Sequence, residues 1–251
     1  MTARWRYVVP NLLTCVSISL GLLAISQATS GNFDGACWSV LLCVLLDKAD
    51  GTAARLLKAS SEFGMQMDSL SDLITFGIAP ATICLAAFVG QKPIISLDAI
   101  PYYRYVVYIG AFLFAICGAL RLAKFNVLSE SYGDGWFFGA PTTISGAVVC
   151  CYFLTVRKYG LPWPYLAAVP AMMIGLALLM VSRFAMPKVG MSKSLALNIV
   201  VIVNLVLVYA FGIIRIYPEY LLFAAVVYLV VSLIYGLVKG IKPPPIEVDS
   251  A

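Results

Sequence analysis

Residues 195–214 read LALNIVVIVNLVLVYAFGII, a stretch of 20 residues without one charged side chain. With a rise of about 1.5 Å per residue, a helix of this length crosses the roughly 30 Å hydrocarbon core of a bilayer. Similar stretches recur along the chain, which is 62% hydrophobic and 12% charged, a balance that ordinary soluble domains do not have. We therefore predict an all-α polytopic membrane protein, since helices satisfy their backbone hydrogen bonds internally.

Turn-rich segments divide the chain into about eight predicted transmembrane helices. Breaks such as TSGNFDG and GQKPIISLDAIP are rich in residues that end helices. The helices are expected near residues 10–28, 34–56, 68–89, 102–126, 139–157, 163–182, 195–214 and 219–238. Together they form one transmembrane domain, residues 1–240, followed by a short cytoplasmic tail, residues 241–251.

The first residues of the chain allow two interpretations. Residues 1–9 place Trp5 and Tyr7 among arginines, a composition typical of a short helix at the membrane interface. The longer N-terminal stretch also resembles a signal peptide, with two arginines, an apolar segment and then small residues. Because many further spans follow, we interpret residues 10–28 as an uncleaved first transmembrane helix.

The lysines and arginines indicate how the helices are oriented. An even number of spans places both termini on one side, and with the N-terminus inside most cations at loops and helix ends are also inside. The inner set is Arg4, Arg6, Arg55, Lys58, Arg121, Lys124, Arg183, Lys188, Lys193, Lys239 and Lys242, and the outer set is Lys92, Arg157, Lys158 and Arg215. The positive-inside rule therefore predicts a multi-pass protein of the cell membrane with cytoplasmic termini, although Arg157 and Lys158 oppose it. Because the net charge of +5 is scattered in this way, we expect membrane lipids and no nucleic acid as partners.

Cysteine and histidine usage limits the possible metal chemistry. The seven cysteines lie within apolar stretches without a CxxC pair, so we interpret them as small core residues. Histidine is absent, which removes the commonest ligand for transition metals. Any metal bound here is therefore expected to be a hard cation held by oxygen atoms.

Residues 45–73, LLDKADGTAARLLKASSEFGMQMDSLSDL, contain five of the twelve acidic residues of the chain, and four of these five are aspartates. At about 100° per residue, Asp47 and Asp50 share one stripe of the second helix, and Asp68 and Asp72 share one stripe of the third. Two antiparallel helices joined by a short turn can direct all four carboxylates at one point. Such uncompensated charges are costly in a membrane, so we predict one or two bound divalent cations, Mg²⁺ or Mn²⁺.

A simpler alternative is that these acids form solvated salt bridges with Lys48, Arg55 and Lys58. That alternative explains a single aspartate but not four on two coincident stripes. Small residues on the same stripes, Gly51, Ala54 and Gly64, leave room for a ligand against the helix backbone. Together with an arginine suited to phosphate, these features indicate metal-assisted phosphoryl transfer.

The segment from Asp47 to Asp72 reads D-x-x-D-G-x-x-A-R-x8-G-x-x-x-D-x-x-x-D without a departure. This pattern resembles the signature of the CDP-alcohol phosphatidyltransferase family. The resemblance implies metal ligation by the first three aspartates, with the fourth as the general base and a further contact to the metal. It also implies a homodimer and a cytidine-diphosphate pocket lined by Gly51, Ala54, Arg55 and Gly64.

Three further stretches resemble the branch of that family that uses L-serine as the acceptor: PNLLT (residues 10–14), SEFGMQMDSLSDLITFGIAPA (residues 61–81) and ALRLAKFNV (residues 119–127). The resemblance implies transfer of the phosphatidyl group from CDP-diacylglycerol to serine, with release of cytidine monophosphate (CMP). Asn11 and Thr14 are candidate nucleotide contacts, although helix capping after Pro10 also explains Asn11.

Basic residues near the end of the fourth predicted helix are the candidate acceptor site. Arg121 and Lys124 share one face there, with Asn126 close by, and we expect them to hold the serine carboxylate or a lipid phosphate. The alternative is that both cations snorkel to the membrane surface and anchor the helix.

Three other functions remain open. The same chemistry could use glycerol phosphate, inositol phosphate or choline as the acceptor. Intramembrane carboxylates also occur in ion transporters, although that function does not explain the Gly and Ala spacing. An inactive structural protein would bind no cytidine nucleotide. Since histidine cannot activate a Ser or Cys nucleophile here, a direct displacement is favoured over a covalent intermediate.

Overall fold

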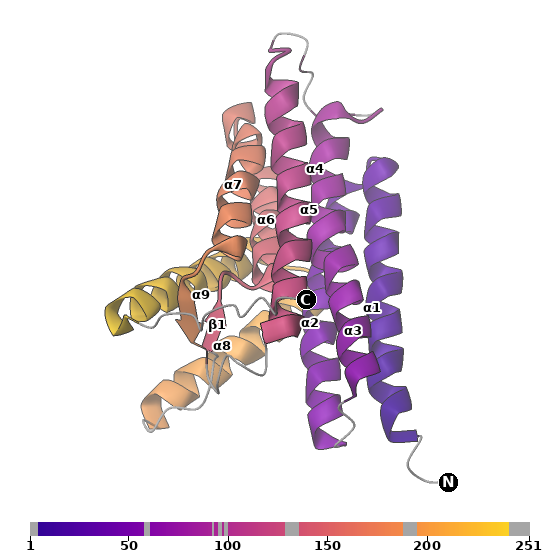
Figure 1. Cartoon of the computed structure of the whole chain (residues 1–251). Coiled ribbons are helices and arrows are strands. Elements are labelled where there is room, and N and C mark those ends of the chain that lie inside the picture. Colours follow the sequence, from indigo (N-terminus) through magenta and orange to yellow (C-terminus); the bar gives the residue numbers. More distant parts are fainter. Residues whose placement is uncertain are drawn as a thin grey trace, which may run out of the picture.

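The computed structural model describes residues 5–57, 61–91, 93–94, 97, 100–128, 136–187 and 195–240, and almost all of them are helical (Figure 1). The elements are α1 (Trp5–Thr29), α2 (Phe33–Leu56), α3 (Glu62–Asp72), the π-helix η1 (Leu73–Ile78), α4 (Ala79–Val89), α5 (Tyr103–Leu128), β1 (Trp136–Phe138), α6 (Thr142–Lys158), α7 (Trp163–Val181), β2 (Ala185–Pro187), α8 (Leu195–Ile214) and α9 (Pro218–Lys239). Because α3, η1 and α4 follow without a break, the described residues form eight continuous helices.

Five helices in the described part of the chain are long and apolar enough to cross a bilayer. They are Val8–Thr29, Glu62–Val89, Tyr103–Val127, Trp163–Val181 and Pro218–Lys239. Of the other three, α2 is as long but carries the acidic segment, α6 has 17 residues, and the apolar part of α8 is Asn198–Ile214. The chain is therefore a polytopic helical membrane protein, as its hydrophobic stretches predict.

Two predictions about helix starts are wrong. From Trp5 onward α1 is one continuous helix with Pro10 inside it, so the described residues contain no separate interfacial helix and Asn11 is not a cap. Pro10 is tolerated because it lies near the helix start, where few helical hydrogen bonds are lost. The third helix begins at Glu62, not near residue 68, because Ser61 caps it by accepting a hydrogen bond from the Gly64 amide at 3.0 Å.

The prediction of a purely helical fold misses one short pair of strands. β1 and β2 pair antiparallel, with Phe137 opposite Met186. The pair brings the connection between α5 and α6 to the same end of the molecule as the connection between α7 and α8. A helix-period pattern gives no signal for such a contact because each strand has only three residues.

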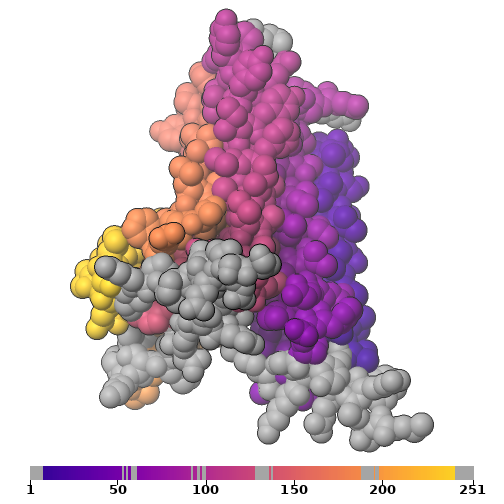
Figure 2. Space-filling model, in the orientation of Figure 1, coloured from indigo at the N-terminus to yellow at the C-terminus, as the bar shows by residue number. Residues whose placement is uncertain are grey.

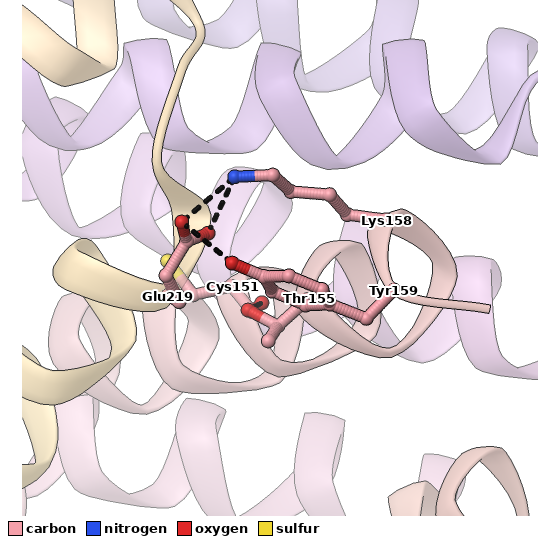
Figure 3. A network of polar contacts seen from close by, with 5 residues as sticks. All are labelled: Cys151, Thr155, Lys158, Tyr159 and Glu219. Carbon is pink, nitrogen blue, oxygen red and sulfur yellow. Dashed lines mark hydrogen bonds and ion pairs between the residues drawn. The ribbon is translucent and has the colours of Figure 1, made fainter. Parts of the chain in front are cut away.

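Ion pairs hold the opposite end together, and Figure 3 shows the one between Lys158 and Glu219. Arg157 at the end of α6 bonds Asp34 of α2, with Nε 2.6 Å from Oδ1. The neighbouring Lys158 lies 2.7 Å from Glu219 of α9, which also accepts a hydrogen bond from the Tyr159 hydroxyl at 3.1 Å. The connections α1–α2, α6–α7 and α8–α9 therefore meet at this end, and the two cations that oppose the positive-inside prediction are both paired with carboxylates.

The long helices α1, α2, α3–η1–α4 and α5 lie side by side, whereas α8 and α9 run obliquely to them (Figure 1). α5 forms part of the outer surface (Figure 2). The side chains that it exposes at helical spacing are apolar or aromatic: Tyr105, Ile109, Phe112, Ile116 and Leu120. This is the surface expected of a helix that faces lipid.

Glycines allow two helices to approach η1 closely. A Cβ on Gly21 of α1 would lie 2.6 Å from the Thr75 side chain, and one on Gly146 of α6 would lie 2.9 Å from the Phe76 carbonyl oxygen. Both contacts are shorter than real Cβ atoms allow. The π-helical turn that directly follows Asp72 is therefore fixed by packing from two sides, as is common for such turns near functional sites.

Substituting Gly236 by Ala is expected to destabilise the protein by about 1–3 kcal/mol, because α9 or β2 must move. The new Cβ would overlap the Ala185 carbonyl oxygen. The matched control is Gly175→Ala in α7, where a Cβ meets nothing within 4 Å. Thermal unfolding in detergent micelles should show a lower Tm for Gly236→Ala alone. Equal melting of both variants would contradict the close approach.

Candidate metal and substrate site

Three carboxylates converge where α2 meets α3. One oxygen each from Asp47, Asp50 and Asp68 lies within 4.8 Å of the other two. Asp47 and Asp50 share a stripe near the end of α2, and Asp68 faces them from α3. The helical spacing thus brings together three of the four aspartates that the sequence places on these stripes.

Asp72 lies beside this group, not within it. It is the last residue of α3, one turn after Asp68, and directly precedes η1. Its carboxylate is close enough to interact electrostatically with Asp47 and Asp68, although it is not one of the three clustered oxygen donors. The arrangement separates a cluster of three possible ligands from one adjacent carboxylate.

The three clustered carboxylates fit a hard divalent cation. Two oxygens bound to one Mg²⁺ at about 2.1 Å can be at most roughly 4.2 Å apart, so small side-chain rotations would bring all three onto one ion. Asp50 is only 6% exposed, which makes an uncompensated charge there unfavourable. In the described part of the chain no other group of three acidic or cysteine residues is so close together. The donors are all oxygen, which suits Mg²⁺ or Mn²⁺.

Of the three cations in the salt-bridge alternative, the described side chains include Lys48, which is exposed and acts electrostatically on Asp47 without forming an ion pair with it. The ion pairs of the described side chains lie elsewhere in the molecule and join Arg157 to Asp34 and Lys158 to Glu219. None of the four aspartates of the segment takes part in one. The side chains of Arg55 and Lys58 lie outside the described residues.

Arg121 of α5 faces the acidic cluster. It is 9% exposed, and its Nη1 donates a hydrogen bond to Thr142 Oγ1 at 3.0 Å. Its positive charge acts on both Asp47 and Asp72, so it offsets part of their mutual repulsion. A snorkelling cation would be exposed, so that alternative is wrong for Arg121. Lys124 is half-buried one turn further along.

Asn126 joins α5 to α3. Its Oδ1 accepts a hydrogen bond from the Ser69 hydroxyl at 3.1 Å, and its Nδ2 donates one to Gln66 Oε1 at 3.2 Å. Both ends of the amide are therefore engaged between helices. In the structure Asn126 connects two helices, whereas the sequence analysis predicts that it helps to bind the serine or a lipid phosphate.

The predicted nucleotide residues have different surroundings. Gly51 is exposed, and a Cβ there would meet nothing within 4 Å, whereas a Cβ on Gly64 would lie 3.6 Å from Asn11 Oδ1. Asn11 and Gly64 are therefore neighbours, and Ala54 is half-buried on α2. Thr14 differs: it is 5% exposed, and its hydroxyl lies 3.1 Å from Asp50 Oδ2.

The structure also brings residues to the site that the sequence analysis did not identify. Thr143, in the first turn of α6, lies close to Asp47. Tyr209 of α8 interacts electrostatically with Asp47, and Tyr228 of α9 with Arg121. Two threonines directly after Pro141 are a visible signal for the start of a helix. The tyrosines carry no such signal, because each is one polar group in a generic apolar helix.

Comparison with known proteins gives a family match over most of the chain. The model of a family described as CDP-alcohol phosphatidyltransferase matches residues 7–181, from the third residue of α1 to the end of α7. The chain is similar to the CDP-diacylglycerol–serine O-phosphatidyltransferase of Helicobacter pylori, with 34% identity over 93% of this chain and 91% of that protein. It is also similar to the protein of that name in Bacillus subtilis, with 32% identity over 71% of this chain and 89% of the relative. The archaetidylserine synthase of Methanothermobacter thermautotrophicus is 34% identical over 74% of this chain and 73% of its own length.

Proposed function

Because this chain belongs to the CDP-alcohol phosphatidyltransferase family, we propose that it transfers a phosphatidyl group from CDP-diacylglycerol to L-serine. The products are phosphatidylserine and CMP. The observation that carries the proposal is the cluster of Asp47, Asp50 and Asp68 within 4.8 Å of one another, in the spacing that the family signature requires. The names of the relatives support serine as the acceptor.

Asp47, Asp50 and Asp68 would hold the divalent cation, with Asp72 near enough to add a contact. Bound there, Mg²⁺ or Mn²⁺ supplies positive charge that polarises the diphosphate and neutralises the leaving nucleotide. Asp72 accepts the proton of the serine hydroxyl. The serine oxygen then forms a bond to the phosphorus that carries diacylglycerol, and the bond from that phosphorus to the CMP oxygen breaks.

The other charged and small residues have binding roles in this proposal. Gly51, Ala54 and Gly64 leave space for the nucleotide against α2 and α3, with Asn11 beside Gly64 and Arg55 near the diphosphate. Arg121 and Lys124 provide positive charge for the serine carboxylate or a lipid phosphate. Asn126 keeps the end of α5, which carries both cations, against α3.

We further propose that all eight helices cross the membrane and that the active site faces the cytoplasm. The ion pairs at one end of the molecule and the strand pair at the other support this topology, because successive connections then alternate between the two faces. Residues 1–240 would form the transmembrane domain, with residues 241–251 as a cytoplasmic tail. Assembly as a homodimer follows from the family resemblance alone.

The proposal is tested by CMP release from purified protein given CDP-diacylglycerol. Release is expected only with Mg²⁺ or Mn²⁺ and L-serine, because the cluster needs a cation and the lipid needs an acceptor. Glycerol phosphate, inositol phosphate and choline are tested in parallel. Release with one of them instead of serine would show that serine is not the acceptor, but it would agree with catalysis at the four-aspartate site. No release from folded protein, together with cation flux into vesicles without nucleotide, would favour a transporter.

Two of the relatives differ in the lipid that their names imply. One name contains diacylglycerol and the other archaetidylserine, while both contain serine. The acceptor is therefore better supported than the lipid backbone of the donor. The assay should accordingly include an archaeal ether-lipid donor beside CDP-diacylglycerol.

A further inference from the structure

Thr14 contacts one of the clustered aspartates from a different helix. Its Oγ1 lies 3.1 Å from Oδ2 of Asp50, which is 36 residues away in the chain. Thr14 is 5% exposed and Asp50 6% exposed, so the contact is enclosed between α1 and α2. A residue with so little free surface has little left to offer a nucleotide.

The Thr14 hydroxyl has one proton and two possible acceptors. The Pro10 carbonyl oxygen, four residues earlier in α1, is also 3.1 Å from Oγ1. That carbonyl has a helical N–H donor available to it, whereas a carboxylate is the stronger acceptor and forms a charge-assisted hydrogen bond. The proton is therefore best placed on the bond to Asp50. Both distances belong to the same Thr14 side-chain rotamer, in which Oγ1 lies between the two acceptors.

We propose that Thr14 is a positioning residue that orients the Asp50 carboxylate for metal binding. This inference rests on the proposed function, because it assumes that Asp50 is a ligand. A carboxylate with one oxygen held by a hydrogen bond loses less rotational freedom when it binds a cation. Hydrogen-bond partners behind metal ligands typically change metal affinity by about 10- to 100-fold when they are removed.

The test compares Thr14→Val, which keeps the shape but removes the hydroxyl, with Thr14→Ser, which keeps the hydroxyl. The readout is the Kd for Mn²⁺ of the purified full-length protein without nucleotide, from the electron paramagnetic resonance signal of free Mn²⁺. Thr14→Val is expected to raise this Kd about 10- to 100-fold, and Thr14→Ser by no more than about threefold. Thr14→Ala is the second variant if Thr14→Val does not fold.

Ser17→Ala is the matched control. It removes another buried hydroxyl from the same helix, one turn further along, at a residue 2% exposed. Its Mn²⁺ affinity is expected to equal that of the wild type. If Ser17→Ala weakens Mn²⁺ binding as much as Thr14→Val does, the effect comes from general disturbance of α1, and the inference is overturned.

Kinetic measurements distinguish a failure of the positioning role of Thr14 from a failure of the proposed transferase function. In Thr14→Val the Mg²⁺ concentration for half-maximal CMP release should rise, with kcat restored at saturating Mg²⁺. An unchanged Mn²⁺ Kd together with a higher KM for CDP-diacylglycerol would overturn the positioning role and make Thr14 a nucleotide contact, while the proposed function stands. A wild-type protein that binds no Mn²⁺ and releases no CMP would overturn the proposed function itself.

Discussion

Replacing Asp68 by Asn is expected to lower serine-dependent CMP release at least ~10³-fold, because a metal ion supplies several kcal/mol of charge stabilisation and each 1.4 kcal/mol is worth tenfold in rate. Asp68 is the one clustered carboxylate that α3 contributes. Asn keeps the shape of the side chain but removes the negative charge that a cation requires. CMP release and Mn²⁺ affinity, measured on the same preparation, check this expectation.

Although Asp68→Asn lowers activity, it is not expected to lower thermal stability. Without metal, Asp68→Asn relieves repulsion from Asp47 and Asp50, so its Tm is expected to equal or exceed that of the wild type. Mg²⁺ should raise the Tm of the wild type but not that of the variant. At a Mg²⁺ concentration of one hundred times Kd, binding adds about 2.7 kcal/mol to the free energy of unfolding. Glu62→Gln, an exposed position in the first turn of α3, is the control and should behave like the wild type. Near-normal turnover in folded Asp68→Asn would disprove the metal role.

Replacing Gly51 by Ala is expected to impair substrate binding without any loss of stability. Among the described residues outside its own turn of α2, the new methyl group meets nothing within 4 Å, and Ala is favoured over Gly inside a helix by about 0.5–1 kcal/mol. If the nucleotide lies against α2, the methyl group overlaps it. An overpacked contact of this kind costs about 1–3 kcal/mol, which is roughly 5- to 150-fold in affinity.

The measurement is the KM for CDP-diacylglycerol beside the Tm. Gly175→Ala is the matched control, since its Cβ also meets nothing within 4 Å and it lies in α7, away from the acidic segment. We expect the KM to rise only in Gly51→Ala, with the Tm of both variants unchanged or slightly higher. Unchanged kinetics in Gly51→Ala would place the nucleotide away from this face of α2.

Much of the fold is local and could be read from the sequence. The predicted helices at residues 163–182 and 195–214 agree with α7, Trp163–Val181, and α8, Leu195–Ile214, because long apolar runs and turn residues specify helix ends. The spacing of Asp47 and Asp50, and the position of Asp68 after a short turn, depend only on helical periodicity. Their convergence could therefore be predicted before any packing was known.

Contacts between helices depend on which helix faces pack together. The sequence does not predict these pairings, because the apolar faces of different helices have similar compositions. Pro10 suggests a break between an interfacial helix and the first span, whereas in the structure α1 continues through Pro10. The burial of Arg121 against Thr142 could not be told from snorkelling, since both give a cation near a helix end. Tyr209 and Tyr228 reach the site only because α8 and α9 pack against the other helices.

The sequence by itself determined that the protein is a helical membrane protein with a cluster of oxygen ligands, because periodicity and composition are local properties of the chain. The tertiary structure alone decided how that cluster is supported. It placed Thr14 behind Asp50 and set Asp72 beside the three clustered carboxylates. It also held the π-helical turn between Gly21 and Gly146. These contacts join residues that are far apart in the chain, and only the close packing of complementary helix surfaces selects them.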